Sequence, residues 1–291
     1  RERKKVKTLV SATCHPHVLR TMQTYCFSAG TELVVVPQKE GKTDLEALAS
    51  LVDDTTASFC IQQPNFYGQL EEVEQAAEII HQAGGKLIVH CNPISLGVLK
   101  TPAECGADIA VGEGQPLGMP LSFGGPYLGF MSCKSAMARK LPGRIVGQTT
   151  DVDGKRAFVL TLQAREQHIR REKASSNICS NQALCALTAS VYLAAMGSEG
   201  IRQAATLSMS KAHYLAQQLC QISGYEMKFT GPYFHEFVTT CPDSQKALEK
   251  LEQAGILGGY PLSGELEGCI LWCATEKNTK ADMDRLVELL K

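Results

Sequence analysis

Short, continuously apolar segments alternate with amphipathic helical segments over the first half of this 291-residue chain, and this alternation constrains its fold more than any other feature. Strands that are apolar along their whole length are buried on both faces, which is typical of a parallel sheet covered by helices. We therefore expect an α/β fold with a mainly parallel sheet, helices on both faces, and roughly residues 1–150 in the sheet region. Strands are predicted at 6–11, 32–37, 58–62, 86–90, 108–111 and 128–132, and helices at 15–29, from 43 onward and at 70–83.

The second half of the chain has a different pattern. A long helix is predicted from about residue 181 to 196, with Gly197 as its stop signal. The pattern after it predicts a small α+β lobe. We therefore predict a large α/β domain at 1–180 and a linking helix with a small C-terminal domain at 181–291. The lobe has helices predicted at 201–222, 245–254 and 280–291 and strands at 226–229, 236–240 and 269–274.

Local signals mark the ends of two helices in the first half. Gly30 follows the segment 15–29 and predicts that the helix ends there. Thr43 and Glu46 have the spacing of a capping box, so Thr43 is the predicted cap of the next helix.

Charge and cysteine content exclude several classes of protein. The 29 basic and 30 acidic residues give a net charge of −1, so neither nucleic acid nor a membrane surface is an expected partner. The apolar runs are shorter than a membrane span requires. The 12 cysteines are spread singly without a C-x-x-C pair, which favours reduced thiols in a cytoplasmic protein over disulfides, with a zinc site as the minor alternative. His15 and His17 flank Pro16 without a third ligand nearby, and no metal site is predicted.

Ligands of parallel sheets bind beyond the carboxyl ends of the strands, so the loops after the predicted strands are informative. The segment 62–68, Gln-Gln-Pro-Asn-Phe-Tyr-Gly, fits either a ligand-lining loop or an ordinary turn. The segment 112–118 is glycine-rich, but its G-x-G-x-x-x-G spacing and Pro116 disfavour dinucleotide binding. The charged segment 165–173 leads to Ser175, Ser176 and Asn177 before the long helix, a position that fits an anion site or a helix cap.

The segment Arg165-Glu166-Gln167-His168-Ile169-Arg170-Arg171-Glu172-Lys173 and the residues after it are similar to the signature of glycine decarboxylase P-proteins of the glycine cleavage system. Segments 143–147 and 151–156 share this resemblance, and 62–66 and 112–118 resemble the α, or N-terminal-half, version. Family α subunits are longer, so an N-terminal segment is expected to be missing here. The resemblance implies the fold-type-I architecture of pyridoxal-phosphate enzymes.

The resemblance also implies a chemistry from which this chain departs. Pyridoxal enzymes require a lysine for the Schiff base and usually an aspartate beside the pyridinium nitrogen. The strand expected to supply the aspartate ends in Asn92, and Gln115 lies near the position expected for the lysine. Lys100 and Lys134 are the nearest lysines, and both are displaced from that position. An amine is required for the linkage, and glutamine does not replace it.

The resemblance therefore implies a cytoplasmic α subunit that lacks the lysine and is inactive alone, within an αβ heterotetramer. The β subunit would carry pyridoxal phosphate, decarboxylate glycine and pass the aminomethyl group to the lipoyl arm of H-protein. Ser175, Ser176 and Asn177 would reach across the interface to the cofactor. His168 and Arg170 would line the lipoyl or substrate path, with surface or interface salt bridges as an equal alternative. The open alternatives are a self-sufficient pyridoxal enzyme using a lysine such as Lys134, and a structural or regulatory partner of the β subunit.

Overall fold

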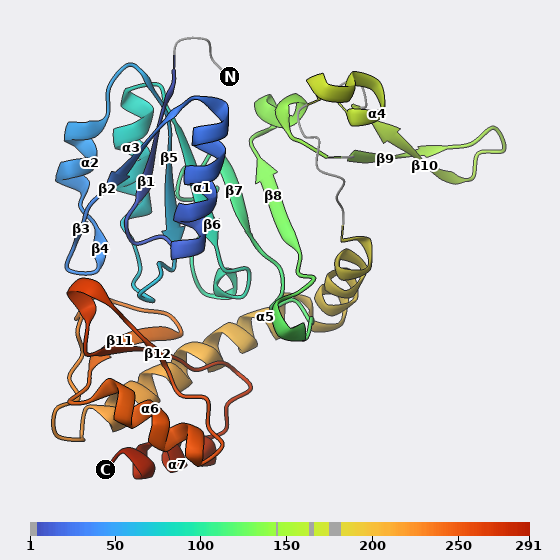
Figure 1. The fold of residues 1–291 in the computed structure, drawn as a ribbon. Coiled ribbons are helices and arrows are strands. Elements are labelled where there is room, and N and C mark those ends of the chain that lie inside the picture. The colour runs from blue at the N-terminus through green and yellow to red at the C-terminus, as the bar shows by residue number, and fades with distance from the viewer. Residues whose placement is uncertain (1–4, 144, 163–165, 175–181) are drawn as a thin grey trace.

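The computed structural model describes residues 5–143, 145–162, 166–174 and 182–291. Its larger part contains a six-stranded sheet of order β2-β1-β5-β6-β7-β8 (Figure 1). Every neighbouring pair is parallel except β7 with β8, which is antiparallel. The strands are β1 (Lys7–Ser11), β2 (Glu32–Val36), β5 (Thr56–Gln63), β6 (Lys86–Cys91), β7 (Ile109–Glu113) and β8 (Gly129–Cys133).

The sheet strands agree with the predicted segments to within a few residues, but the sheet is shorter than expected. Its last strand ends at Cys133, whereas the sheet region was predicted to reach about residue 150. The strands beyond β8 form a separate two-stranded hairpin.

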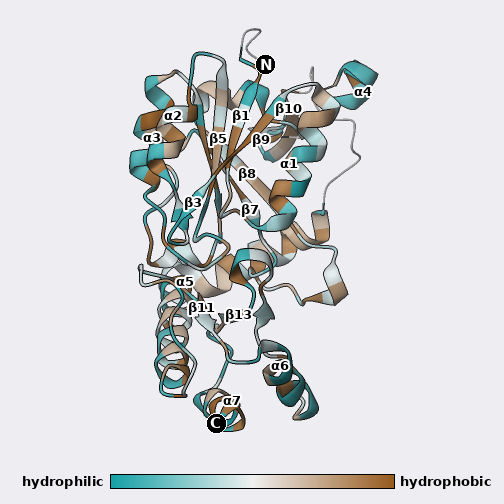
Figure 2. Ribbon diagram, turned by 60° about the vertical axis from the view of Figure 1, so that its left-hand side comes forward, coloured by the Kyte–Doolittle hydropathy of each residue, from teal (hydrophilic) through white to brown (hydrophobic). Residues whose placement is uncertain are grey.

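Helices cover both faces of the sheet, as the apolar strands predict (Figure 2). The helix α1 (Pro16–Ala29) lies on one face, where Val10, Cys14 and Cys60 are buried. The helices α2 (Leu45–Leu51) and α3 (Val73–Gln82) lie on the other. That second face holds the larger apolar core, which includes Phe59, Ile61 and Leu87 from the strands.

One of the two predicted helix ends is confirmed and the other is wrong. Gly30 adopts a left-handed conformation with φ of 60° at the end of α1. Thr43 does not cap α2. Asp44 does, with its carboxylate accepting hydrogen bonds from the backbone N–H groups of Glu46 and Ala47. Thr43 lies instead in β4 (Lys42–Thr43), which pairs with β3 (Gln38–Lys39).

A two-stranded hairpin projects from the large sheet beyond β8 (Figure 1). It pairs β9 (Ile145–Thr150) with β10 (Arg156–Thr161) in antiparallel register, and the sequence patterns did not predict it. The Asp151 carboxylate closes its turn by accepting from the N–H groups of Asp153 and Lys155. The short helix α4 (Gln167–Arg170) follows. Short 3-10 helices occur at Ser95–Gly97, Ser122–Gly124, Ser135–Lys140, Arg171–Lys173 and Gly264–Leu266.

The helix α5 (Ala183–Leu219) connects the large sheet to the C-terminal lobe. Gly197, the predicted stop, is a kink with φ of 62° inside it. Contrary to the sequence expectation, α5 is long and apolar enough to cross a membrane by length and composition, which is weak evidence of a span. Its second half is instead part of the lobe core, with Ala212, Leu215 and Leu219 buried.

The C-terminal lobe packs a three-stranded antiparallel sheet of order β11-β13-β12 against its helices. Trp272 is buried at its centre and donates a hydrogen bond from Nε1 to Thr239 Oγ1 at 2.9 Å. The predicted strand at 226–229 does not form, and only Met227 bridges to Thr239.

The predicted division into two domains at residue 180 stays a prediction. The elements are β11 (Glu236–Thr240), α6 (Ser244–Gln253), β12 (Tyr260–Pro261), β13 (Cys269–Cys273) and α7 (Lys280–Leu290).

Candidate functional site

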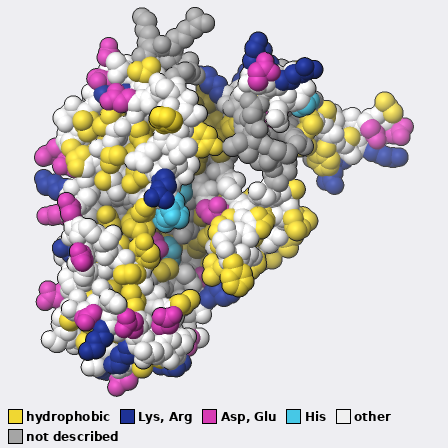
Figure 3. All heavy atoms as spheres, in the orientation of Figure 1, with side chains coloured by type: hydrophobic (Ala, Val, Ile, Leu, Met, Phe, Trp, Pro, Cys, Tyr) yellow, Lys and Arg dark blue, Asp and Glu magenta, His cyan; other side chains and the backbone are white. Residues whose placement is uncertain are grey.

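The carboxyl ends of β1, β5, β6 and β7 form one edge of the sheet, and this edge faces the C-terminal lobe (Figure 1). His15 lies just beyond β1, where its backbone N–H donates to Gln62 Oε1 at 2.8 Å. Phe66, from the loop after β5, meets the His15 ring edge to face at 5.0 Å. His90 lies near the end of β6. Figure 3 shows histidine side chains exposed on this face at the lower end of the sheet.

The two imidazoles at this edge are poor bases. Burial lowers the pKa of His90, and the nearby His15 lowers it further, while Glu113 opposes the shift. Burial and then His17 lower the pKa of His15. Both rings therefore favour the neutral form, which can donate and accept hydrogen bonds. The His90 Nδ1 atom is buried, and no hydrogen-bond partner for it exists among the described residues.

A buried carboxylate, Glu71, organises the loops beside this edge. Its Oε1 accepts hydrogen bonds from Thr13 Oγ1 and Asn65 Nδ2, both at 2.7 Å. Its Oε2 accepts from the Thr43 N–H at 2.9 Å. These bonds join the loop after β1, the β3–β4 hairpin and the loop after β5. The sequence analysis did not identify Glu71, and its position directly before a helix and after a polar loop was the available signal.

The loop after β7 is the place where the family resemblance expects the cofactor lysine. There, Gln115 turns its side chain back onto its own loop and donates from Nε2 to Met119 O at 2.7 Å. Glu113 accepts from the N–H groups of Gln115 and Leu128 through its Oε1 atom. At the end of β6, Asn92 Oδ1 accepts from the Ile94 N–H. The loop therefore offers neither an amine nor a free carboxylate.

The two displaced lysines do not supply the amine. Lys134 follows β8, and because β8 is antiparallel to β7 its end lies at the opposite edge of the sheet. Its Nζ contacts Asp108 Oδ1 at 3.1 Å. Lys100 is exposed and pairs with Glu74 on α3 at 2.6 Å. Neither of these two lysines therefore lies where the family resemblance expects the cofactor amine.

The other predicted site residues are not gathered at this edge. His168 and Arg170 are exposed on α4, beside the hairpin and away from the carboxyl ends of the strands (Figure 1). Ser175, Ser176 and Asn177 lie outside the described residues. The cysteines of the described part are unpaired, and many of them are buried.

Comparison with solved structures defines the class of protein. A cysteine desulfurase of Escherichia coli is 18% identical and superposes with a TM-score of 0.73 over 99% of this chain and 72% of its own. A sphingosine-1-phosphate lyase of Burkholderia pseudomallei is 15% identical, with a TM-score of 0.71 over 98% of this chain and 62% of its own. The sheet order and these superpositions give the chain the predicted fold of fold-type-I pyridoxal-phosphate enzymes.

Residues 1–290 match the model of the family described as glycine cleavage system P-protein, and the chain belongs to this family. A crystal structure of glycine decarboxylase (P-protein) of the glycine cleavage system, in inhibitor-bound form, is 41% identical, with a TM-score of 0.93 over 98% of this chain and 65% of its own. Among curated relatives, a protein of Carboxydothermus hydrogenoformans is 52% identical over 98% of this chain, and one of Moorella thermoacetica is 49% identical over 98%. Each is named probable glycine dehydrogenase (decarboxylating) subunit 1. The chain spans 64% and 65% of their lengths.

Proposed function

We propose that this chain is the subunit of a two-subunit glycine decarboxylase that does not hold the cofactor. In this proposal a partner β subunit binds pyridoxal phosphate and glycine, and the aminomethyl group passes to the lipoyl arm of H-protein. The relatives named as subunit 1 support the division into subunits. We place the assembly in the cytoplasm because the described cysteines are free thiols.

The loop after β7 is the observation that carries the proposal. Gln115 is hydrogen-bonded to Met119 O, and Glu113 is engaged by the backbone N–H groups of Gln115 and Leu128. These bonds hold the loop closed on itself at the position where a cofactor-binding subunit requires a lysine. Since a glutamine amide does not form a Schiff base, the cofactor must be linked to another chain.

An apolar surface on this chain fits the docking of a partner subunit. The first half of α5 exposes Leu184, Leu187 and Val191, which are 76%, 60% and 61% accessible. The hairpin exposes Phe158 at 63%. Exposed large apolar side chains grouped on one element are typical of protein interfaces. We call these four residues the α5–hairpin surface and assign it to the β subunit.

The segment that joins these two elements carries the proposed contacts to the partner's site. Ser175, Ser176 and Asn177 come before α5 in the sequence and would donate hydrogen bonds to the cofactor phosphate on the β subunit. His168 and Arg170 on α4 would line the path of the lipoyl arm or pair with partner acids. Replacing both Ser175 and Ser176 with Ala should weaken cofactor retention in the αβ complex, and unchanged retention would refute this assignment.

The test is an absorbance spectrum of the purified chain with pyridoxal phosphate, alone and then with the β subunit. We expect no Schiff-base band from the chain alone, and a band that changes with glycine when β is added. A band trapped by borohydride on the chain alone would refute the division of labour and favour a self-sufficient enzyme. Full glycine turnover by β and H-protein without this chain would instead indicate a regulatory role.

A further inference from the structure

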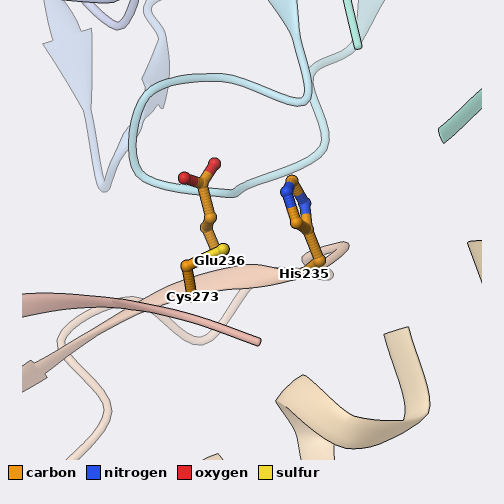
Figure 4. A group of neighbouring side chains, drawn as sticks. All are labelled: His235, Glu236 and Cys273. Carbon is orange, nitrogen blue, oxygen red and sulfur yellow. The ribbon is translucent and has the colours of Figure 1, made fainter. Parts of the chain in front are cut away.

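Three side chains with metal-binding atoms meet where the C-terminal lobe faces the large sheet. His235 and Glu236 lie at the start of β11, and Cys273 ends the neighbouring strand β13. Glu236 and Cys273 are direct partners in the antiparallel ladder. One nitrogen of His235, one carboxylate oxygen of Glu236 and the Cys273 sulfur all lie within 4.8 Å of one another. Figure 4 shows the His235 and Glu236 side chains pointing the same way, toward the loop opposite.

Polar groups of this cluster are buried without a compensating partner among the described residues. The His235 Nδ1 atom is buried and has no hydrogen-bond partner among the described residues. Leaving such an atom without a partner is unfavourable. Burial raises the pKa of the Glu236 carboxyl to about 7. Burial, with Glu236 and Glu276 as further causes, also raises the pKa of the Cys273 thiol. A bound divalent cation would provide a partner for the His235 nitrogen. It would also favour the deprotonated carboxylate and thiolate, because it attracts their negative charge.

We propose that His235, Glu236 and Cys273 form a zinc-binding site. A thiolate, an imidazole and a carboxylate are the three ligand types that zinc prefers, whereas calcium and magnesium require oxygen ligands. Tetrahedral bonds of about 2.0–2.3 Å place ligand atoms roughly 3.3–3.8 Å apart, so modest side-chain rotation within the cluster is sufficient. Water would take the fourth position.

The proposed site lies beside the contact between the two parts of the molecule. The loop after β5 packs directly on β11, where the Phe234 N–H donates to Gly68 O at 3.1 Å and the Leu70 N–H donates to Pro232 O at 2.8 Å. A Cβ added at Gly68 would lie 1.8 Å from Glu236 O, so no side chain fits between them. All three proposed ligands lie at β11 or its neighbour β13, so a bound ion would link these two strands where they face the loop after β5. The proposal does not depend on the proposed function.

Zinc binding to the purified, metal-stripped protein tests the proposal by competition with a chromogenic indicator. We expect one tightly bound zinc per chain and a rise in the thermal midpoint on its addition. His235→Asn, Glu236→Gln and Cys273→Ser should each weaken binding at least tenfold and abolish the thermal shift. Cys220→Ser, which removes another exposed thiol of the lobe, should leave both unchanged.

Cobalt(II) provides a readout that a purely structural role would not affect. We expect a thiolate-to-cobalt charge-transfer band in the wild-type protein and in Cys220→Ser, but not in Cys273→Ser. The proposal is overturned if the wild-type protein binds no zinc. It is overturned equally if the three ligand variants bind zinc as tightly as the wild-type protein, because the metal would then be held by other thiols.

Discussion

The Nζ atom of Lys134 lies 3.1 Å from Oδ1 of Asp108, at the edge of the sheet opposite the carboxyl ends of the parallel strands. Asp108 is 4% exposed and immediately precedes β7, while Lys134 immediately follows β8. Because β7 and β8 are antiparallel, the start of one lies beside the end of the other. A lysine held at that edge does not reach a ligand bound beyond the carboxyl ends.

Lys134→Ala should leave the cofactor chemistry of the assembly unchanged. Lys134 lies at the edge of the sheet opposite the carboxyl ends of the parallel strands, and its Nζ atom pairs with Asp108. The measurement is borohydride trapping of pyridoxal phosphate followed by peptide mapping of the αβ complex. Lys140→Ala, in the exposed segment after β8, is the matched control. Loss of a trapped adduct in the Lys134 variant alone would show that the lysine assignment is wrong.

Asp108→Asn should lower the free energy of unfolding by about 2 kcal/mol. The Asp108 Oδ2 atom accepts from His81 Nε2 at 2.7 Å and from the Leu87 N–H at 3.0 Å. Burial by itself would raise the pKa of Asp108, yet these bonds and Lys134 outweigh it and lower the pKa below its usual value.

A depressed carboxyl pKa has a defined pH dependence. Its stabilisation is present above the unfolded-state pKa of about 4 and is lost as pH falls through the folded-state pKa. The difference between wild type and Asp108→Asn in urea unfolding should therefore shrink below about pH 4. Asp54→Asn, at an exposed position, is the control and should match the wild-type protein throughout. A constant difference down to the lowest pH would argue against this account.

Glu71→Gln should destabilise the protein by about 2–4 kcal/mol. The Glu71 carboxylate receives donors on both oxygens, and an amide NH₂ in place of either oxygen would face one of these donors. Chemical denaturation measures the change. Glu72→Gln is the matched control, because Glu72 forms a surface pair with Lys42 and should contribute little. Equal effects of the two substitutions would contradict a structural role for the Glu71 network.

Gly68→Ala should destabilise the protein by at least about 2 kcal/mol more than Gly154→Ala. Both glycines have positive φ, 80° and 75°, so both substitutions carry the same backbone strain. Only at Gly68 does the new Cβ meet another backbone, at Glu236 O, since nothing lies within 4 Å at Gly154. Thermal unfolding of the pair isolates this close approach. Similar thermal midpoints would mean that the loop after β5 moves away at little cost.

Leu187→Ser and Phe158→Ser should each weaken association with the β subunit at least tenfold while leaving the unfolding of the isolated chain unchanged. Both residues belong to the α5–hairpin surface and are exposed in the chain itself. Analytical ultracentrifugation of mixed subunits gives the affinity. Leu257→Ser, at a 94% exposed position in the C-terminal lobe, is the control. Undiminished binding by both variants would place the partner elsewhere.

The sequence determined the elements of the large sheet because their signals are local. The apolar runs at 32–37 and 86–90 predict strands, and the bounds of the observed β2 and β6 agree with them to within one residue. The burial predicted for the first run is only partial, because β2 is an edge strand. Gly30 correctly predicted the end of α1, whereas Gly197 was predicted to end a helix and instead forms a kink inside α5. Both glycines have positive φ, which other residues avoid. The family resemblance predicted that Gln115 lies near the position where a cofactor lysine is expected. That prediction needs only the identity of the residue.

Only the tertiary structure decided how distant segments meet. The sequence did not show that β8 runs antiparallel, and this single reversal places Lys134 at the wrong edge. It assigned the cap of α2 to Thr43, whereas the Thr43 hydroxyl is engaged by Ser11 at 2.8 Å, a contact across 32 positions. His235, Glu236 and Cys273 form a cluster because strand pairing brings position 236 opposite 273. Local propensity acts over neighbouring residues, while strand order and register are set by burial and pairing across the whole chain.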